Sequence, residues 1–281
     1  MVVSDELIME DLDIPAKPDL LIEIDNHLKE QEPCLASLSA IIARDVAVSA
    51  QILKIINSSA YGLSKPMANI RQAVAYIGIS GTINIVKSFA LKQSVLQEQC
   101  ALNLGRFWDT AEELANACLY IGKQVKSDVP EDYFYVFGLF HNIGVPIMAC
   151  NFAKYPKVLA KANEDNRFSL VQLEQKVFQT QHTKVGYHLA CSWNLPNEIS
   201  QVIRHHHNRR YLAKVDDPIC AQLYAVFQLA ENLLSQDRRF IDAPDWPYVE
   251  KACLDLLHID QEEYEHLQEE LSDLMREVVE F

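Results

Sequence analysis

The chain has 281 residues, 49% of them hydrophobic and only 8 of them glycine, and its formal net charge is −14. This length can bury one large core or two smaller ones, and so few glycines argue against a β-protein rich in tight turns and favour helices joined by short loops. The sequence has no run of 18 apolar residues and no basic leader, so neither a membrane span nor a secretory signal is expected.

The negative charge is concentrated at the two ends of the chain. Residues 1–13 carry five acids and no base, and residues 260–281 carry nine acids and one arginine, which leaves 25 acids and 24 bases between them. Acidic ends repel nucleic acid, so a nucleic-acid partner is not expected. The seven cysteines are scattered without C-x-x-C spacing, which is typical of reduced core thiols and predicts a cytoplasmic protein.

The first half reads as short helices that follow an acidic tail at residues 1–12. The segment 18–30 has its leucines and isoleucines at helical spacing, and further helices are predicted at 35–45 and 46–57. The last two have the rhythm of a DNA-reading helix-turn-helix. The second of them carries a single base, Lys54, and is too apolar to read base edges, so we expect it to be core.

Capping residues mark where these helices begin and end. Asp45 is suited to cap the helix at 46–57, because its side chain can accept from the first free backbone N–H groups. Gly78 is expected to end the next helix, and Ser80 to cap the one that follows it. No segment shows the alternating pattern of a half-buried strand, so the predicted fold is all-α.

The second half continues with helices of the same kind. We expect the helix that carries His141 to bend or end close to Pro146, because proline removes a backbone donor and clashes with the preceding turn. In the tail helix, apolar residues share one stripe, which is typical of a docked helix and, as an alternative, of a partner-binding surface. The remaining predicted helices cover 106–126, 170–193, 196–207, 219–235 and 262–281.

The run "GLFHNIG" at 138–144 is the most informative short motif. A two-metal phosphohydrolase needs imidazoles to bind each ion and carboxylates to bridge or neutralise them, and adjacent His and Asp on one helix suit this task. Here His141 is followed by Asn142, whose amide brings no negative charge and cannot act as a base. Other ligands could compensate for one weak ligand, so the residue pair alone leaves open a working metal site and a site that has lost its hydrolytic chemistry.

The chain resembles the HDOD (HD-related output domain) family of bacterial signalling proteins, which is related to the HD-superfamily metal-dependent phosphohydrolases. The similarity lies in "LSAIIARDVAVSAQILKIINSSAYG", "NIRQAVAYIGISGTINIV", "FWDTAEELANACLYIG", "YFYVFGLFHNIG", "HTKVGYHLACSWNLP" and "VIRHHHN". It implies two packed helical lobes, an N-terminal one at 13–100 and a degenerate HD-like bundle at 101–208. Residues 13–208 would form the HDOD domain, and 209–281 a helical extension that completes the bundle.

Carried over by position, the resemblance implies a damaged metal set. Thr110, Asn142 and Glu231 stand where active HD enzymes have ligands, while His141, His182 and His206 retain imidazoles. The three histidines could hold one weakly bound divalent metal ion, but no resident cofactor is expected. On this basis we expect a vestigial site.

The basic run "RHHHNRR" allows a different interpretation. Arg204, Arg209 and Arg210 could hold a phosphate or nucleotide, because guanidinium groups pair well with phosphate oxygens. The alternative is a solvated basic turn that compensates Asp216 and Asp217.

Two functions therefore stay in contention. The first is a non-catalytic signal-transduction module that acts through contacts with signalling proteins, away from any membrane. The second is a metal-dependent phosphohydrolase that acts on a nucleotide or cyclic dinucleotide. Thr110 and Asn142 favour the first, and the sequence leaves the signal, the partner and the oligomeric state open.

Overall fold

The computed structural model describes residues 12, 18–29, 34–96, 100, 102–164 and 168–279. Every regular element within these ranges is helical and none is a strand, which confirms the all-α prediction. The elements are α2 Asp19–Leu28, α3 Leu35–Ala43, α4 Val46–Ile56, η1 Ser59–Tyr61, α5 Ile70–Leu96, α6 Leu104–Gln124, α7 Glu131–Phe140, α8 Gly144–Asn151, α9 Tyr155–Glu164, α10 Leu170–Phe178, α11 His182–Ser192, α12 Asn197–His205, α13 Pro218–Arg239, α14 Trp246–Leu257 and α15 Gln261–Val279.

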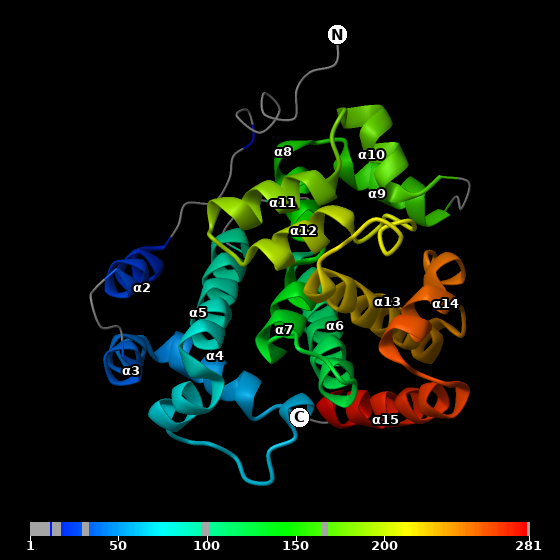
Figure 1. Ribbon diagram of the computed structural model, residues 1–281. Helices are drawn as coiled ribbons and strands as arrows, with labels where there is room; N and C mark the ends of the chain where they lie inside the picture. Colours follow the sequence, from blue (N-terminus) through cyan, green and yellow to red (C-terminus); the bar gives the residue numbers. More distant parts are fainter. Residues whose placement is uncertain are drawn as a thin grey trace.

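The N-terminal helices gather around α5. Helices α2, α3 and α4 pack against it on one side, and α6 and α7 contact it on the other (Figure 1). The apolar face predicted for α2 is confirmed, since Leu21 and Ile24 are fully buried. Helix α4 is core as expected, with Ile52 and Ile56 fully buried, and the Asp45 carboxylate accepts from the Val48 N–H at 3.0 Å as its predicted cap.

Helix α5 changes direction at Gly78, where a break was expected. Gly78 has φ of 84°, a value that glycine adopts without steric cost, and its carbonyl accepts from the Thr82 hydroxyl at 2.6 Å. The predicted cap at Ser80 is wrong. Gly78 is the one residue of α5 with non-helical dihedral angles, so Ser80 already lies inside the second helical segment.

The second half of the chain is built on α6, α7 and α13, which pack against one another. Buried aromatic rings fill the space between them, and the rings of Phe137 and Phe227 meet edge to face with centroids 5.1 Å apart. Gly138 allows the close approach of α7 to α6, because a Cβ atom there would lie 2.7 Å from the Ala115 Cα. This packing holds the chain that follows α7 against the centre of the bundle.

Two buried polar contacts join α5 to the second half. The Asn84 amide donates to the Asp132 carboxylate of α7 at 2.9 Å, and the Lys87 Nζ donates to the Asn194 carbonyl after α11 at 2.6 Å. Burial raises the pKa of Asp132, and the Asn84 hydrogen bond opposes that rise. Buried polar groups need such partners, so these contacts specify how α5 seats against α7 and α11.

The residue boundaries of the predicted lobes stay a prediction. The expected junction at 97–106 falls partly outside the described residues, and so does the acidic tail at 1–12 except for Leu12. The divisions at 13–100, 101–208 and 209–281 therefore rest on the sequence.

Two stretches of the described chain are long and apolar enough, by length and composition, to cross a membrane. They are Ile70–Leu96 and Glu131–Asn151, and 61% and 83% of their most apolar windows are buried inside the protein. Core helices of a folded bundle pass the same test, and these two lie among the helices they pack against.

The tail helix α15 docks on α6 and α13. Leu267, Leu271 and Met275 of its predicted stripe are buried, and the Tyr120 hydroxyl donates to the Glu270 carboxylate at 2.5 Å. The side chain of Val278, also assigned to the stripe, lies outside the described residues. The stripe is accordingly the docked face of the helix.

A close backbone contact lies between α8 and α11. A Cβ atom on Gly144 would lie 2.0 Å from the His182 carbonyl oxygen, so Gly144→Ala must push two helices apart. We expect a loss of about 1–3 kcal/mol or more in the free energy of unfolding, measured by denaturant titration. The control is Gly105→Ala, where the new Cβ would meet only the Asn103 Oδ1 at 3.4 Å and stability should be unchanged or higher. Equal effects of the two variants would contradict this account.

Candidate functional site

The first component of the site lies between α7 and α8. Helix α7 ends at Phe140, so that His141 and Asn142 occupy the turn before α8, and Pro146 lies in the first turn of α8. The interruption predicted near Pro146 is confirmed, but the prediction that His141 and Asn142 lie on the helix is wrong, since both lie in the turn after α7. A proline in the first turn removes a donor that would have no helical acceptor, so it favours the new start.

The second component arises where the predicted helix at 170–193 proved to be two helices. Helix α10 ends at Phe178, the next residue Gln179 has φ of 59°, and α11 begins at His182. The Glu174 carboxylate explains the break, because it accepts from the His182 backbone N–H at 3.0 Å and from the His182 Nδ1 at 2.8 Å. A continuous helix would place residues eight apart on separate turns and forbid both contacts.

The third component comes from the end of α12. The predicted helix through residue 207 is wrong, since α12 ends at His205 and leaves His206 and His207 in the turn that follows. On a helix, consecutive side chains diverge by about 100°, but in this turn the two imidazole rings lie 4.2 Å apart. His205 points elsewhere, and its ring stacks on Tyr211.

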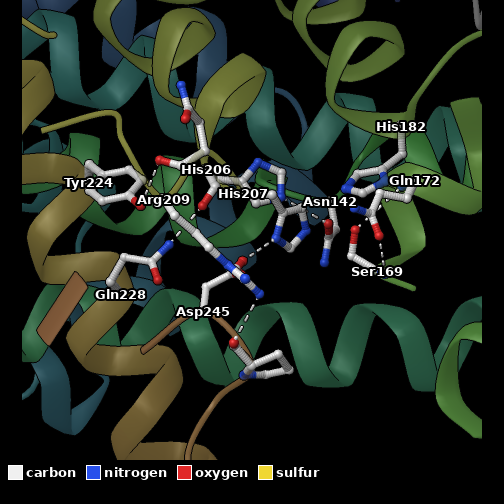
Figure 2. Close-up of polar contacts among 12 residues, drawn as sticks. Asn142, Ser169, Gln172, His182, His206, His207, Arg209, Tyr224, Gln228 and Asp245 are labelled. Atoms are coloured by element: carbon white, nitrogen blue, oxygen red, sulfur yellow. Dashed lines mark hydrogen bonds and ion pairs between the residues drawn. The ribbon is translucent and has the colours of Figure 1, made fainter. Parts of the chain in front are cut away.

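These components bring three imidazole rings together. One ring nitrogen each from His182, His206 and His207 lies within 4.8 Å of the other two, and Asn142 lies beside them (Figure 2). In each ring the Nδ1 already has an acceptor: Glu174 for His182, the Ile203 carbonyl at 2.8 Å for His206, and Asp245 at 2.9 Å for His207. With Nδ1–H donating outward, the Nε2 of a neutral imidazole ring keeps a lone pair for a ligand.

His141 stands next to this cluster. Its Nδ1 faces the Gly138 carbonyl at 2.7 Å, and its ring lies 5.5 Å from the His206 ring and 5.0 Å from Phe227. Burial lowers the pKa of His141 to about 3, so the ring stays neutral. The structure thus places His182 and His206 of the predicted set together with His207. Sequence reasoning had not selected His207, because the end of α12 at His205 carries no sequence signal.

The three positions predicted to have lost a ligand lie in different surroundings. Asn142 is half-buried, with its Oδ1 3.3 Å from the His206 Nε2. Glu231 on α13 is half-buried, and burial raises its pKa while the nearby His207 opposes the rise. Thr110 is exposed on α6, and its hydroxyl donates to the Arg106 carbonyl of its own helix at 3.0 Å.

Two carboxylates, those of Glu174 and Asp245, contact the outer edges of the histidine cluster. Burial opposes ionisation of Glu174, but its contacts with His182 and the hydrogen bond from Tyr155 outweigh burial and lower its pKa. The same balance holds for Asp245, where burial is outweighed by His207 and Arg209. Burial also works against the charged form of His207, yet the hydrogen bond to Asp245 and the surrounding acids raise its pKa.

The three arginines of the basic run face different partners. The Arg204 guanidinium lies 5.0 Å from the Tyr187 ring, while Arg209 donates to Asp245 at 2.7 Å and lies over the Tyr248 ring. Arg210 is exposed. Arg209 therefore belongs to the hydrogen-bond network of His207, and anion binding by the three residues together stays a prediction.

These pKa shifts give a test by side-chain NMR. Across pH 5–8 His141 should show no titration, and His207 should titrate with a midpoint above its ordinary value of 6.5. Since the folded-state pKa of His207 is raised, its contribution to stability is fully present below pH 6.5 and is lost as the pH rises through that midpoint. Asp245→Asn should lower the midpoint, and a wild-type midpoint below 6.5 would show that Asp245 does not govern this ring.

Comparisons with known proteins agree on the fold. An uncharacterised protein of Treponema pallidum (strain Nichols) is 29% identical over 202 residues, which are 70% of this chain and 38% of that protein. This chain thus spans well under half the length of that curated relative.

Solved structures with the same helical arrangement share little sequence. A protein of Shewanella amazonensis SB2B, provisionally named a metal-dependent phosphohydrolase, is 20% identical with a TM-score of 0.66, over 96% of this chain and 95% of its own. A protein of Marinobacter aquaeolei VT8, provisionally named a signal transduction protein, is 20% identical with a TM-score of 0.66, over 94% of this chain and 57% of its own. At these identities the likeness establishes the fold alone.

The family assignment rests on a broader match. The model of the HDOD domain matches residues 14–209, which cover more than half of the chain and include every histidine of the cluster. The chain belongs to the HDOD domain family.

Proposed function

We propose that the protein is a non-catalytic regulatory module of bacterial signal transduction, which acts in the cytoplasm through contacts with signalling proteins. Membership of the HDOD family supports this role, as does the Marinobacter aquaeolei protein of the same fold that is named for signal transduction. The structural support comes from the charges around the histidine cluster.

The observation that carries this proposal is the position of the acidic side chains around the histidine cluster. Glu174 and Asp245 contact the outer Nδ1 atoms of His182 and His207, so they support the rings instead of bridging ions. The side chain in contact with the inner nitrogen of His206 is the neutral Asn142. Hydrolysis by two metal ions needs carboxylates that bridge or neutralise four positive charges held close together, and this arrangement does not supply them.

The net charge of the site leads to the same conclusion. Glu174 and Asp245 bring two negative charges, and Arg209 neutralises part of the second through its contact at 2.7 Å. Glu231 is a third acid near His207, but burial raises its pKa and so disfavours its charged form. Two divalent ions a few ångströms apart repel each other strongly even at an effective dielectric constant of about 20. A pair of ions is therefore unfavourable at this cluster.

The alternative function is a metal-dependent phosphohydrolase. The convergent ring nitrogens of the cluster favour it, since imidazole is a common ligand of catalytic metals. It would require a base or bridging group that Asn142 cannot be, because an amide neither accepts a proton at neutral pH nor carries charge.

An activity assay separates the two functions. We expect purified protein with Mn²⁺, Mg²⁺, Ni²⁺ or Fe²⁺ to hydrolyse cyclic dinucleotides, nucleotides and generic phosphodiesters no faster than a sample without protein. Enzymes commonly reach ~1–1,000 turnovers per second, so genuine catalysis would be easy to detect. The matched variant is His141→Ala, and metal-dependent turnover that this variant abolishes would overturn the regulatory proposal.

A further inference from the structure

We propose that His182, His206 and His207 bind one divalent transition-metal ion through their Nε2 atoms. Two of these ligands, His182 and His206, belong to the set that the family resemblance points to, and His207 takes the place of His141 as the third ligand. The inference deepens the proposed function and rests on it, since the ion would act as a structural or regulatory ligand and not as a catalyst.

The first argument is an unsatisfied nitrogen. His182 is completely buried, and its Nε2 has no hydrogen-bond partner among the residues that the structure describes. Leaving a buried polar atom unpaired costs about 1–3 kcal/mol, so such an atom usually has a ligand. It lies within the group whose ring nitrogens are at most 4.8 Å apart. A shift of the rings by a fraction of this distance would let one ion reach all three at the usual Zn–N distance of about 2.0–2.1 Å.

The second argument is the outer support of each ring. Histidines that bind metals commonly donate their other N–H to a carboxylate or a backbone carbonyl, which fixes the tautomer and the ring orientation. All three rings show this arrangement, with Glu174, the Ile203 carbonyl and Asp245 as the acceptors. Imidazole rings that only filled the core would not need Nδ1 to be held by an acceptor in all three rings.

The third argument is charge. A single divalent ion adds two positive charges, and Glu174 and Asp245 stand one ring away from where it would sit, with Arg209 offsetting part of their charge. The imidazole donors select Zn²⁺, Ni²⁺ or Co²⁺ over Mg²⁺ and Ca²⁺, which prefer oxygen. His207 is half-buried while the other two rings are buried, so the ion would enter past His207.

Binding would join parts of the chain that are far apart in sequence. His182 begins α11, His206 and His207 follow α12, and Asp245 directly precedes α14 (Figure 2). One ion would therefore fix the relative positions of three helices at this face of the protein. The expected consequence is a conformation and a stability that respond to the metal, which is a means of regulation that needs no turnover.

The test uses the full chain, purified without a polyhistidine tag and stripped with a chelator. Calorimetric titration with Zn²⁺ should give one ion per chain, and Co²⁺ should give the visible absorption of a low-symmetry nitrogen site. His207→Ala should weaken Zn²⁺ binding at least ~100-fold, whereas Asp245→Asn, which removes an outer support, should weaken it roughly 10–100-fold. Zn²⁺ should also raise the melting temperature of the wild type and not that of His207→Ala.

The control comes from a neighbouring histidine. His205→Ala changes the same run of three, but its ring stacks on Tyr211 outside the cluster, so Zn²⁺ binding should be unchanged. Circular dichroism would verify that each variant folds. Since His206 is fully buried and its loss could impair folding, the half-buried His207 carries the test.

The outcomes distinguish this inference from the proposed function. The inference is overturned if the wild type binds no Zn²⁺, if His207→Ala binds as tightly as the wild type, or if His205→Ala abolishes binding. Each of these results leaves the regulatory proposal intact when no phosphodiester is hydrolysed. Zn²⁺ binding that depends on His207, without turnover, supports both. Turnover by the metal-loaded protein overturns the regulatory proposal and the non-catalytic role of the ion, and leaves only the binding site itself.

Discussion

The buried carboxylate of Glu174 is the constraint on which the candidate site depends. A charge without exposure to water is tolerated only when its oxygens are bonded, and here the donors are the His182 backbone, the His182 ring and the Tyr155 hydroxyl. These bonds require the chain to turn between α10 and α11 and to start α11 at His182. They also direct Nδ1 of His182 to the carboxylate and leave Nε2 facing the other histidines. One buried acid thus sets a helix boundary, a tautomer and the orientation of a ring.

The residues that converge at this site lie mainly at the ends of helices. His206 and His207 converge because α12 stops one residue earlier, and Asn142 reaches them because α7 stops before it. Close packing at Gly144 brings the start of α8 into contact with the His182 carbonyl, so that the start of α8 and the start of α11 pack against each other. Backbone groups at helix ends lack helical partners, so these positions are where side chains and turns can be arranged freely.

The chemistry available to the cluster follows from what surrounds it. Imidazoles face inward and carboxylates face their outer edges, so the pattern suits one ion held by neutral nitrogens and supported by outer charges. The same fold with an aspartate in place of Asn142 would bring charge to the inner side. A single side chain at this turn can therefore change the charge of the site, while the helical framework stays the same.

The sequence alone was sufficient for the helical class, the cap at Asp45, the break at Gly78 and the apolar stripe of α15, because each depends on residues within a few positions of one another. It also identified His182 and His206 as candidates and Asn142 as the residue that removes charge. The pairing of Glu174 with His182, the inclusion of His207 and the exposure of Thr110 were decided by tertiary structure. These features depend on where α10 and α12 end and on which helices then meet, and no local pattern encodes contacts between segments so far apart.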